Sequence, residues 1–505
     1  MSIPLSPPGL ADAAALALTL DRAGSDPLSL QLARQISALI LAGRITEGAR
    51  LPSTRSLAAD LDVSRSTIVE AFDQLAAEGY LEGRRGSGMF VTARSAPEAG
   101  VGRPPARFAP APTRAAAPRP FEIGIVDVEV APFGEMARLL QRNWRRPSAK
   151  LLRADDPFGL WDLRQAIAGH LAQWRGFAPD PERIVITAGL ADALELIVRA
   201  ALPHGGAAFV EDPGHSTLRH RLAQLGVTPA PVSVDADGVD ISRAPEGVRA
   251  LAAFVTPSRQ FPLGFSLPVS RRLALIEWAR QQDALIVEDD FDSEYRYVGA
   301  PLPALASLDG RERVLYLGSF SKVLFSGLRL GFLVAPERLV AATRQQLTRR
   351  GPVASILAQP ALAEFIASGR YGAHIRRSRR LYARRARALV GEAERVRAFL
   401  HFAPIEAGLH AFAELSAAMA SRFSDRAVSA ALAEVGVAAA PLSDFYMGEP
   451  KRAGLIFGFA AFSDSEIGAA MRKIGERVQG LYDQSSARPL RSTFSTSAIA
   501  ATTKL

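Results

Sequence analysis

The chain contains no cysteine. Disulfides and cysteine-ligated metal sites are therefore excluded, and the composition suits a reducing cytoplasm. No apolar run reaches the roughly 18 residues that a membrane-spanning helix needs. The apolar stretch near the start has no basic residues before it, unlike a signal peptide. We therefore expect a cytoplasmic protein with no membrane segment and no metal site.

With 505 residues the chain is too long for one ordinary domain, so two or three are expected. Hydrophobic residues make up 48% of the sequence, which is enough for large cores, and the net charge of +9 permits a nucleic-acid partner without requiring one. We predict an N-terminal tail at 1–25, a small domain at 26–92, a Pro/Ala/Arg-rich linker at 93–120, a large domain at 121–483 and a disordered polar tail at 484–505.

Segment 26–92 has the pattern of three helices followed by a hairpin. Ser53 and Ser64 precede the second and third helices as N-caps, and a tight turn joins these two helices as in a helix-turn-helix. The hairpin strands are expected at 80–82 and 89–92. The apolar positions expected to face the core of this domain are Leu32, Ile36, Leu39, Ile40, Leu57, Leu61, Ile68, Ala71, Phe72 and Leu75.

Three places in this small domain are expected to contact DNA. The first turn of the third helix points into the major groove, where Arg65 can read a guanine edge or bind a phosphate. Arg55, at the start of the second helix, is placed for the backbone, and the hairpin tip suits a minor groove or phosphates. The predicted set is Arg55, Ser64, Arg65, Ser66, Thr67, Arg84, Arg85 and Gly86. The domain has 7 arginines and 8 acidic residues, so a merely solvated charge pattern is the alternative.

From residue 121 onward, short apolar runs alternate with amphipathic helical stretches. This alternation predicts an α/β domain with a mostly parallel sheet covered by helices on both faces. Ligands of such sheets bind beyond the carboxyl ends of the strands. The strand-like runs are 184–187, 207–210, 250–255, 284–288 and 314–317.

A lysine just after the last of these runs suggests a pyridoxal phosphate pocket, in LYLGSFSKVLFSGLRLG. Lys322 can supply the Schiff-base amine, while Ser319, Ser321 and Arg329 can hold the phosphate. Asp289, at the end of the preceding strand, can keep the pyridine nitrogen protonated. Taken singly, a surface lysine or a helix-capping aspartate is the commoner case. The combination of these residues favours the cofactor.

A second anion site is expected in ITAGLADAL, which reads as a strand, a glycine turn and a helix. The free N–H groups around Gly189 and Leu190 would face a phosphate at the helix N-terminus.

Segment 26–92 resembles the winged helix of GntR-type bacterial regulators, on the motifs LPSTR, VSRST and EGY…GSG. The stretch from about 120 to 477 resembles fold-type I aminotransferases, on DPFGLWDLRQAIAGHLAQWRG, ITAG, EDPGH, TPSRQFPLG, EDDFDSEYRY, LGSFSK, GLRLGF, GLHAFAEL and APLSDFY. Together they are similar to the MocR/GabR subfamily of regulators, in which these two domains are fused.

This resemblance implies a winged helix-turn-helix followed by a fold-type I domain with a smaller C-terminal α+β subdomain. It also implies a homodimer that binds a double-stranded DNA operator. Pyridoxal 5'-phosphate would bind Lys322, with Asp289 on the ring nitrogen and Arg329 on the phosphate.

Several positions depart from the family's usual residues. Phe291 stands where a tyrosine commonly faces the cofactor's phenolic oxygen; it keeps the aromatic packing expected of a cofactor-binding residue but lacks the hydroxyl group. Ala154 replaces a tyrosine that reaches the partner subunit's phosphate. His215 and Arg259 also replace the usual tyrosine and histidine. Both are candidates for effector binding, although Arg259 could equally form a salt bridge elsewhere. AGLIFGFAAF contains no arginine for a substrate carboxylate, and the nearest is Arg452. Efficient transamination is therefore not expected.

Seven arginines crowd the segment HIRRSRRLYARRARAL. They either form a second phosphate-contacting surface for DNA or belong to an exposed helix and pair with acidic neighbours, which is the commoner case. They are Arg376, Arg377, Arg379, Arg380, Arg384, Arg385 and Arg387.

Three functions compete. The leading one is a DNA-binding transcription regulator that senses a small amine or amino acid by its exchange with Lys322. The second is a working aminotransferase that carries a DNA-binding domain, which turnover of about 1 per second or faster would support. The third is a winged-helix repressor whose large domain only dimerises. A cofactor absorbance band that is lost in Lys322→Ala would argue against it.

Overall fold

The computed structural model describes residues 18–84, 86–92, 117–153, 156–202 and 206–486. The chain divides into two compact units, with the division between residues 115 and 116. This point falls inside the predicted linker. Within the described ranges, no helix combines the length and the apolar character needed to cross a bilayer.

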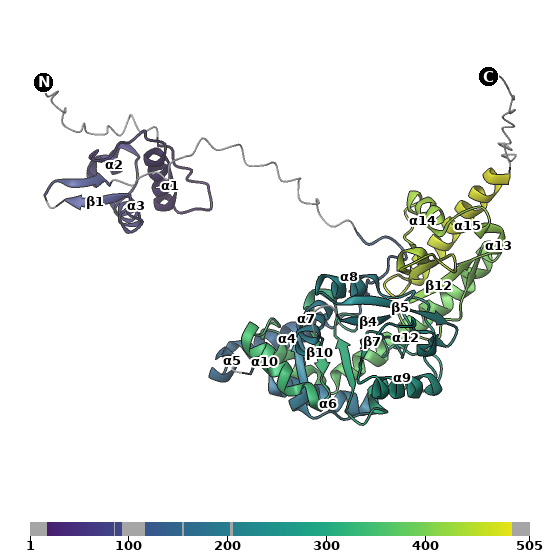
Figure 1. Cartoon of the computed structure of the whole chain (residues 1–505). Helices are drawn as coiled ribbons and strands as arrows, with labels where there is room; N and C mark the ends of the chain where they lie inside the picture. Colours follow the sequence, from purple (N-terminus) through teal and green to yellow (C-terminus); the bar gives the residue numbers. More distant parts are fainter. Residues whose placement is uncertain (1–17, 85, 93–116, 154–155, 203–205, 487–505) are drawn as a thin grey trace, which may run out of the picture. The chain divides into compact units, whose positions relative to one another are not determined.

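The N-terminal unit is a three-helix bundle with a hairpin, as the sequence predicted (Figure 1). Its elements are α1 (Leu28–Leu41), α2 (Thr54–Asp60), α3 (Arg65–Ala77), β1 (Leu81–Arg84) and β2 (Gly88–Val91). The two strands are antiparallel, and Arg84 pairs with Gly88. The strands therefore extend closer to the hairpin tip than the apolar pattern alone suggested.

Two serines begin the second and third helices of this unit. The Oγ of Ser53 accepts a hydrogen bond from the N–H of Ser56 at 3.1 Å, and that of Ser64 accepts one from the N–H of Thr67 at 3.2 Å. Each cap satisfies an N–H group that the helix itself leaves unpaired, which confirms both predicted N-caps.

The predicted apolar positions form the core of the N-terminal unit. Most are buried, while Leu39, Ile40 and Leu61 are partly buried at its edge. Leu18 and Leu20 pack against the same core, and the N–H of Thr19 donates to Gln35 at 3.0 Å. The end of the segment predicted as a tail is thus attached to the small domain.

The second unit is built on an eight-stranded sheet with the order β3-β10-β9-β8-β7-β4-β5-β6. Only β10 and the short β6 run antiparallel to their neighbours, so the sheet is mostly parallel, as predicted. The strands are β3 (Ile184–Thr187), β4 (Ala207–Asp212), β5 (Thr228–Asp235), β6 (Gly238–Val239), β7 (Ala250–Val255), β8 (Leu285–Asp290), β9 (Val314–Ser319) and β10 (Gly331–Val334).

Helices cover both faces of this sheet (Figure 1). Successive residues of one strand point to opposite faces of the sheet, so neighbouring residues of β9 belong to different hydrophobic cores. Leu315 and Leu317 pack under α7, α8 and α10 on one face. Tyr316 packs under α6 and α11 on the other. The helices are α4 (Phe133–Arg145), α5 (Ala149–Arg153), α6 (Trp161–Trp174), α7 (Leu190–Ala201), α8 (Ser216–Gln224), α9 (Val269–Gln281), α10 (Val340–Arg350), α11 (Gln359–Ala367) and α12 (Arg370–Ala393).

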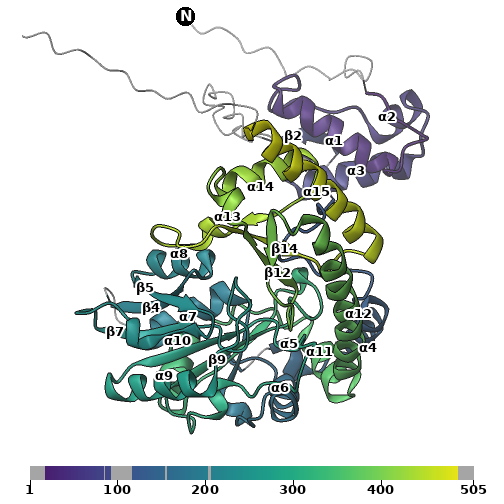
Figure 2. The ribbon, with the colours of Figure 1, turned by 90° about the vertical axis from the view of Figure 1, so that its right-hand side faces the viewer.

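A smaller α+β subdomain follows the long helix α12. Its four strands form an antiparallel sheet with the order β11-β12-β14-β13. Helix α15 lies beside α12, as Figure 2 shows. The elements are β11 (Leu400–Phe402), β12 (His410–Leu415), α13 (Ala417–Ala420), α14 (Asp425–Glu434), β13 (Ala440–Pro441), β14 (Gly454–Gly458) and α15 (Asp464–Ser486). The last helix continues three residues past the predicted end of the domain at 483.

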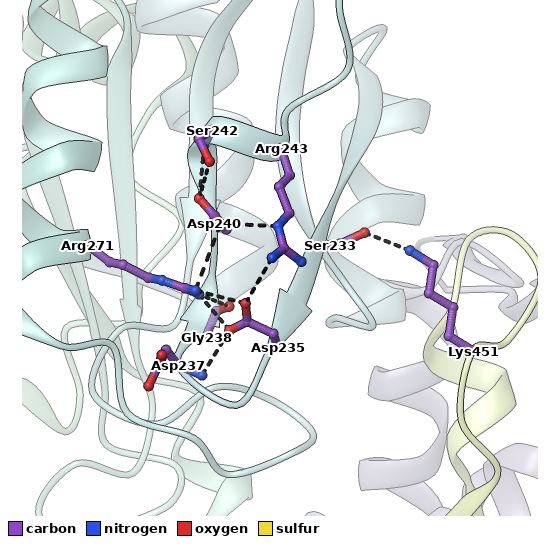
Figure 3. Close-up of polar contacts among 9 residues, drawn as sticks. All are labelled: Ser233, Asp235, Asp237, Gly238, Asp240, Ser242, Arg243, Arg271 and Lys451. Atoms are coloured by element: carbon purple, nitrogen blue, oxygen red, sulfur yellow. Dashed lines mark hydrogen bonds and ion pairs between the residues drawn. The ribbon is translucent and has the colours of Figure 1, made fainter.

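Figure 3 shows one place where the smaller subdomain touches the large sheet. Lys451, in the loop before β14, donates a hydrogen bond to Ser233 of β5 at 2.9 Å. The acidic turn beside it is held by arginine, because Arg271 forms two hydrogen bonds with Asp235 at 2.7 and 2.8 Å. Within the described ranges, no group of three or more His, Cys, Asp or Glu side chains could hold a metal ion.

Candidate functional site

Lys322 lies three residues beyond the end of β9, at the carboxyl edge of the large sheet. Its Nζ donates a hydrogen bond to the carbonyl oxygen of Gly124 at 3.1 Å. Burial lowers the pKa of Lys322, while the carboxylates of Asp292 and Asp289 oppose this shift. A lowered pKa increases the fraction of neutral amine, which is the nucleophilic form.

Asp289 is the next-to-last residue of β8 and pairs in register with Leu317 of β9, five residues before the lysine. Burial raises its pKa to about 7, as do the negative charges of Asp290 and Glu211, whereas Lys322 lowers it. A protonated pyridine nitrogen near this carboxylate would supply the opposite charge that the position lacks.

The third part of the site is the N-terminus of α7. Gly189 caps this helix at φ 92°, which an L side chain rarely adopts, and Leu190 is its first residue. The sheet register brings this turn toward the end of β9, because Gly331 of β10 pairs with Thr187 on one side and Ser319 on the other. One edge of the sheet therefore carries the glycine turn, the two serines and the lysine that the sequence predicted as cofactor ligands.

Two further predicted phosphate ligands follow β9. The N–H of Ser321 donates to the Oγ of Ser319 at 3.2 Å, so the two serines form one tight turn. Arg329 is exposed, adopts a left-handed backbone at φ 51° and has no side-chain partner within the described part of the chain. An exposed guanidinium in the segment that follows these hydroxyl groups is free to bind a phosphate dianion.

These residues fit pyridoxal 5'-phosphate. The amine of Lys322 can bind its aldehyde, Asp289 can pair with its ring nitrogen, and the α7 N-terminus with Ser319 and Arg329 can hold its phosphate.

His215 and Phe291 lie near the same edge. Together with Asp289 and Glu211, His215 lines a small pocket, and burial lowers its pKa to about 4. Its Nδ1 accepts from the N–H of Leu218 at 3.4 Å, so the side chain also caps α8. Its ring and that of Phe291 both lie against Phe261, at centroid distances of 5.3 and 5.8 Å. Phe261 thus contacts both the ring of Phe291 and a His215 side chain that is neutral at pH 7.

Arg259 is occupied by protein partners. It is 5% exposed and forms an ion pair with Asp292 at 3.2 Å, and it also donates to the carbonyl oxygen of His410 at 2.7 Å. Gly408 lies so close that a Cβ atom there would be 2.3 Å from the guanidinium carbon. Arg452 likewise donates two hydrogen bonds to Glu414, at 2.9 and 2.8 Å. Both guanidinium groups therefore have carboxylate partners inside the chain.

One contributor to the site was not evident from the sequence. Gly124 contacts Lys322 through its backbone although 198 residues separate them, and no local pattern marks such a contact. Glu211 sits at a strand end, but its role is set by tertiary contacts. It accepts hydrogen bonds from the N–H and hydroxyl of Thr256, at 3.1 and 2.5 Å, and burial raises its pKa to about 7. Ala154, a predicted departure from the family, lies outside the described residues.

The predicted DNA-contacting residues of the N-terminal unit are exposed, except that Thr67 is half-buried and Arg85 lies outside the described residues. The hydroxyl of Ser64 is within 2.7 and 2.8 Å of those of Ser66 and Thr67. Its lone pairs are therefore already engaged in capping α3.

The arginines of this unit differ in how they are held. Arg65 donates from Nε to Thr54 at 3.3 Å, which links the start of α3 to the start of α2. At the tip, Arg84 pairs with Glu82 at 2.6 Å, and Gly86 has φ 76°. Arg55 is exposed on α2, next in the sequence to the Thr54 that Arg65 contacts.

Comparison with known proteins identifies both units. Residues 28–91 match the bacterial regulatory proteins of the gntR family, and residues 136–474 match aminotransferase class I and II. The chain is 35% identical over 489 residues to the probable rhizopine catabolism regulatory protein MocR of Rhizobium meliloti, covering 94% of this chain and 98% of that protein. The chain belongs to the MocR subfamily of GntR-type transcription regulators.

Other relatives agree with this MocR assignment. The pyridoxine biosynthesis transcriptional regulator PdxR of Corynebacterium glutamicum is 36% identical over 458 residues, which cover 90% of this chain and 97% of that protein. An archaeal alanine:glyoxylate aminotransferase is similar in fold, with a TM-score of 0.67 and 24% identity over 73% of this chain and 92% of that one. The Thermus thermophilus α-aminoadipate aminotransferase LysN, solved with N-(5'-phosphopyridoxyl)-L-leucine, has a TM-score of 0.64 and 26% identity, covering 72% and 92%.

Proposed function

We propose that this MocR-type regulator binds pyridoxal 5'-phosphate at Lys322 and uses it to sense a small amine or amino acid. The observation that carries the proposal is the meeting of Lys322, Asp289 and the α7 N-terminus at one edge of the sheet. The cofactor, when bound, would supply an electrophilic aldehyde to which amines add reversibly.

Each residue of the candidate site would have its own role in binding the cofactor and in the exchange with an effector amine. Burial keeps part of Lys322 neutral, so its amine can bind the aldehyde and be released again. Asp289 would hold a proton on the ring nitrogen, while Ser319, Ser321 and Arg329 would keep the phosphate fixed during exchange. An effector amine would compete with Lys322 for the aldehyde, so the lysine amine would become free when the effector binds.

Coupling to DNA requires that the effector bind two conformations of the protein with different affinity. The smaller subdomain is the candidate moving part, because its Phe445 and Met447 contact the large domain next to His215. The carbonyl of Phe445 accepts from Arg219 at 2.6 Å, and the N–H of Met447 donates to Asp212 at 2.8 Å. We also propose that the protein acts as a homodimer, on the resemblance to its family.

The second candidate is a working aminotransferase. The contacts of Arg259 and Arg452 argue against it, because neither guanidinium is free to bind a substrate carboxylate. Turnover of an amino acid with 2-oxoglutarate at about 1 per second or faster would favour it instead.

The proposal is tested by adding pyridoxal phosphate to the purified protein and reducing the adduct with borohydride. The chain has only five lysines, so peptide mapping can assign the modified one without ambiguity. We expect the label on Lys322 and an absorbance band that is absent in Lys322→Ala and kept in Lys451→Ala. A label confined to another lysine would overturn the proposed site, and an unchanged band across a panel of amines would overturn the sensing role.

A further inference from the structure

A shallow depression on the outside of the aminotransferase-like unit is lined by several cationic and aromatic side chains. It lies where the end of α6 meets α12 and the segment after β8, and it includes Trp174, Arg296, Tyr297, Arg379 and Arg380. None of its lining residues is fully buried. A small ligand would stay largely exposed there, whereas binding sites for small molecules usually enclose most of the ligand. The shape suits a large partner that lies across the surface.

The arginines of α12 fall into two groups by their contacts. Arg384 pairs with Asp464 at 3.0 Å, Arg385 pairs with Asp127 at 2.7 Å, and Arg377 donates to a backbone carbonyl oxygen. Within the described ranges the other four have no ion pair: Arg376, Arg379, Arg380 and Arg387. Pairing with acidic neighbours therefore explains only part of the run.

One cation in the depression, Arg379, is positioned by neighbours that do not neutralise it. The guanidinium of Arg379 lies over the ring of Trp174 at 5.6 Å, and Trp174 stacks on His170 at 5.8 Å. A cation–π contact holds the guanidinium but leaves its N–H edges available for an anion. Burial and the charge of Arg175 lower the pKa of His170 to about 4, so this ring adds no charge of its own at neutral pH.

Arg296 is also incompletely satisfied. Its nearest carboxylate, on Glu406, is 3.6 Å away and more than half exposed, so this ion pair is weak. The Nε atom of Arg296 is buried and has no hydrogen-bond partner in the described structure. Three guanidinium groups thus share one depression and repel one another, and a polyanion that neutralises them would be favoured.

We propose that this depression, defined by Arg296, Arg379 and Arg380, is a second DNA-contacting surface that binds backbone phosphates of duplex DNA. Guanidinium groups bind phosphate oxygens through paired N–H groups, and such contacts are independent of sequence. The inference rests on DNA binding by the winged-helix unit, because DNA is then the polyanion that this protein meets.

The test is the salt dependence of binding to a random-sequence duplex of about 60 base pairs, measured by fluorescence anisotropy with the full chain. Each phosphate contact that is neutralised contributes about 0.9 to the slope of log K against log salt. Replacing two contacting arginines, in Arg379→Gln/Arg380→Gln, should therefore lower the slope by about 1.8. The matched control is Arg384→Gln/Arg387→Gln, which removes the same charge from the same helix away from the depression and should lower it by less than about 0.5.

Further measurements make the outcome decisive. Arg380→Glu changes an exposed side chain, so it should fold normally, and it should weaken binding more than Arg387→Glu does. An equal salt slope for wild type and Arg379→Gln/Arg380→Gln would overturn the inference. An equal decrease of the slope in Arg379→Gln/Arg380→Gln and in the control Arg384→Gln/Arg387→Gln would also overturn it.

Inorganic phosphate, added at constant ionic strength, gives a further outcome. If it bound the depression while the duplex slope stayed unchanged in Arg379→Gln/Arg380→Gln, the depression would bind a free anion and not DNA, which would overturn the inference. Loss of all duplex binding in Arg65→Ala with intact binding in Arg379→Gln/Arg380→Gln would overturn this surface while leaving the proposed function standing.

Discussion

The guanidinium group of Arg259 lies 3.2 Å from the carboxylate of Asp292, and both side chains are almost completely buried. The two residues come from loops of the large domain, and Arg259 reaches the backbone of His410 in the smaller subdomain. The hydrogen bond from Arg259 to His410 therefore joins the two parts of the aminotransferase-like unit, and the ion pair with Asp292 holds its donor in place. It also keeps a positive charge next to Asp292, whose own carboxylate acts on Lys322.

Arg259→Ala should be strongly destabilising. The change leaves the carboxylate of Asp292 buried without a partner, which typically costs about 3–5 kcal/mol. Urea or thermal unfolding would measure the loss. Arg452→Ala breaks a half-exposed ion pair with Glu414 and should cost about 1 kcal/mol or less. Equal losses in the two variants would mean that the buried pair has no special role, and Asp292→Asn added to Arg259→Ala should recover part of the stability.

Asp289→Asn should weaken binding of pyridoxal phosphate by about 10- to 150-fold. This range corresponds to the 1.5–3 kcal/mol that a hydrogen bond to a charged group contributes. Absorbance or fluorescence titration of the cofactor into the variant would measure it. Asp237→Asn removes an exposed carboxylate at the turn after β5 and should leave the affinity unchanged (Figure 3). An unchanged affinity of Asp289→Asn for pyridoxal phosphate would mean that this carboxylate does not pair with the ring nitrogen of the cofactor.

Glu211 should make the cofactor-free protein less stable as the pH rises. Its pKa is raised by burial to about 7, so the folded protein holds a proton that the unfolded chain releases near pH 4.5. The free energy of unfolding should therefore decrease between about pH 4.5 and 7, by at most about 3 kcal/mol from this group. Glu211→Gln should flatten the profile in that window, whereas Glu312→Gln, at an exposed position, should not. A profile in Glu211→Gln as steep as that of the wild type would assign the pH dependence to other groups.

Arg65→Ala should weaken specific DNA binding by about 1–3 kcal/mol, or roughly 5- to 150-fold. The residue is exposed at the first turn of α3, and it lies in the unit that does not contain Lys322. Gel-shift titration with DNA upstream of the protein's own gene would measure the loss, with Arg34→Ala on α1 as the control. Cofactor content should be the same in all three proteins. Joint loss of cofactor and DNA binding would contradict the division into two independent units.

The sequence was most informative where function depends on local order along the chain. Ser53 and Ser64 are caps because hydroxyl groups before a helix satisfy free N–H groups, and the structure has both. Lys322 and Asp289 could be placed at one sheet edge because parallel strands share a carboxyl end. Contacts between segments that lie far apart in the sequence could not be predicted in this way. From the sequence, Arg259 could either bind the effector or form a salt bridge within the chain. Which of the two it does depends on its contacts with Asp292, Gly408 and His410 together.

Two of the contacts between the smaller subdomain and the large domain differ in strength. Near Arg259 the contact is a buried hydrogen bond from a charged guanidinium group to the carbonyl oxygen of His410, which contributes about 1.5–3 kcal/mol. Near Lys451 the contact is a hydrogen bond to Ser233 that water can replace, at a net cost of about 1 kcal/mol. Thermal motion of this subdomain should therefore be smaller beside His410 than at Lys451.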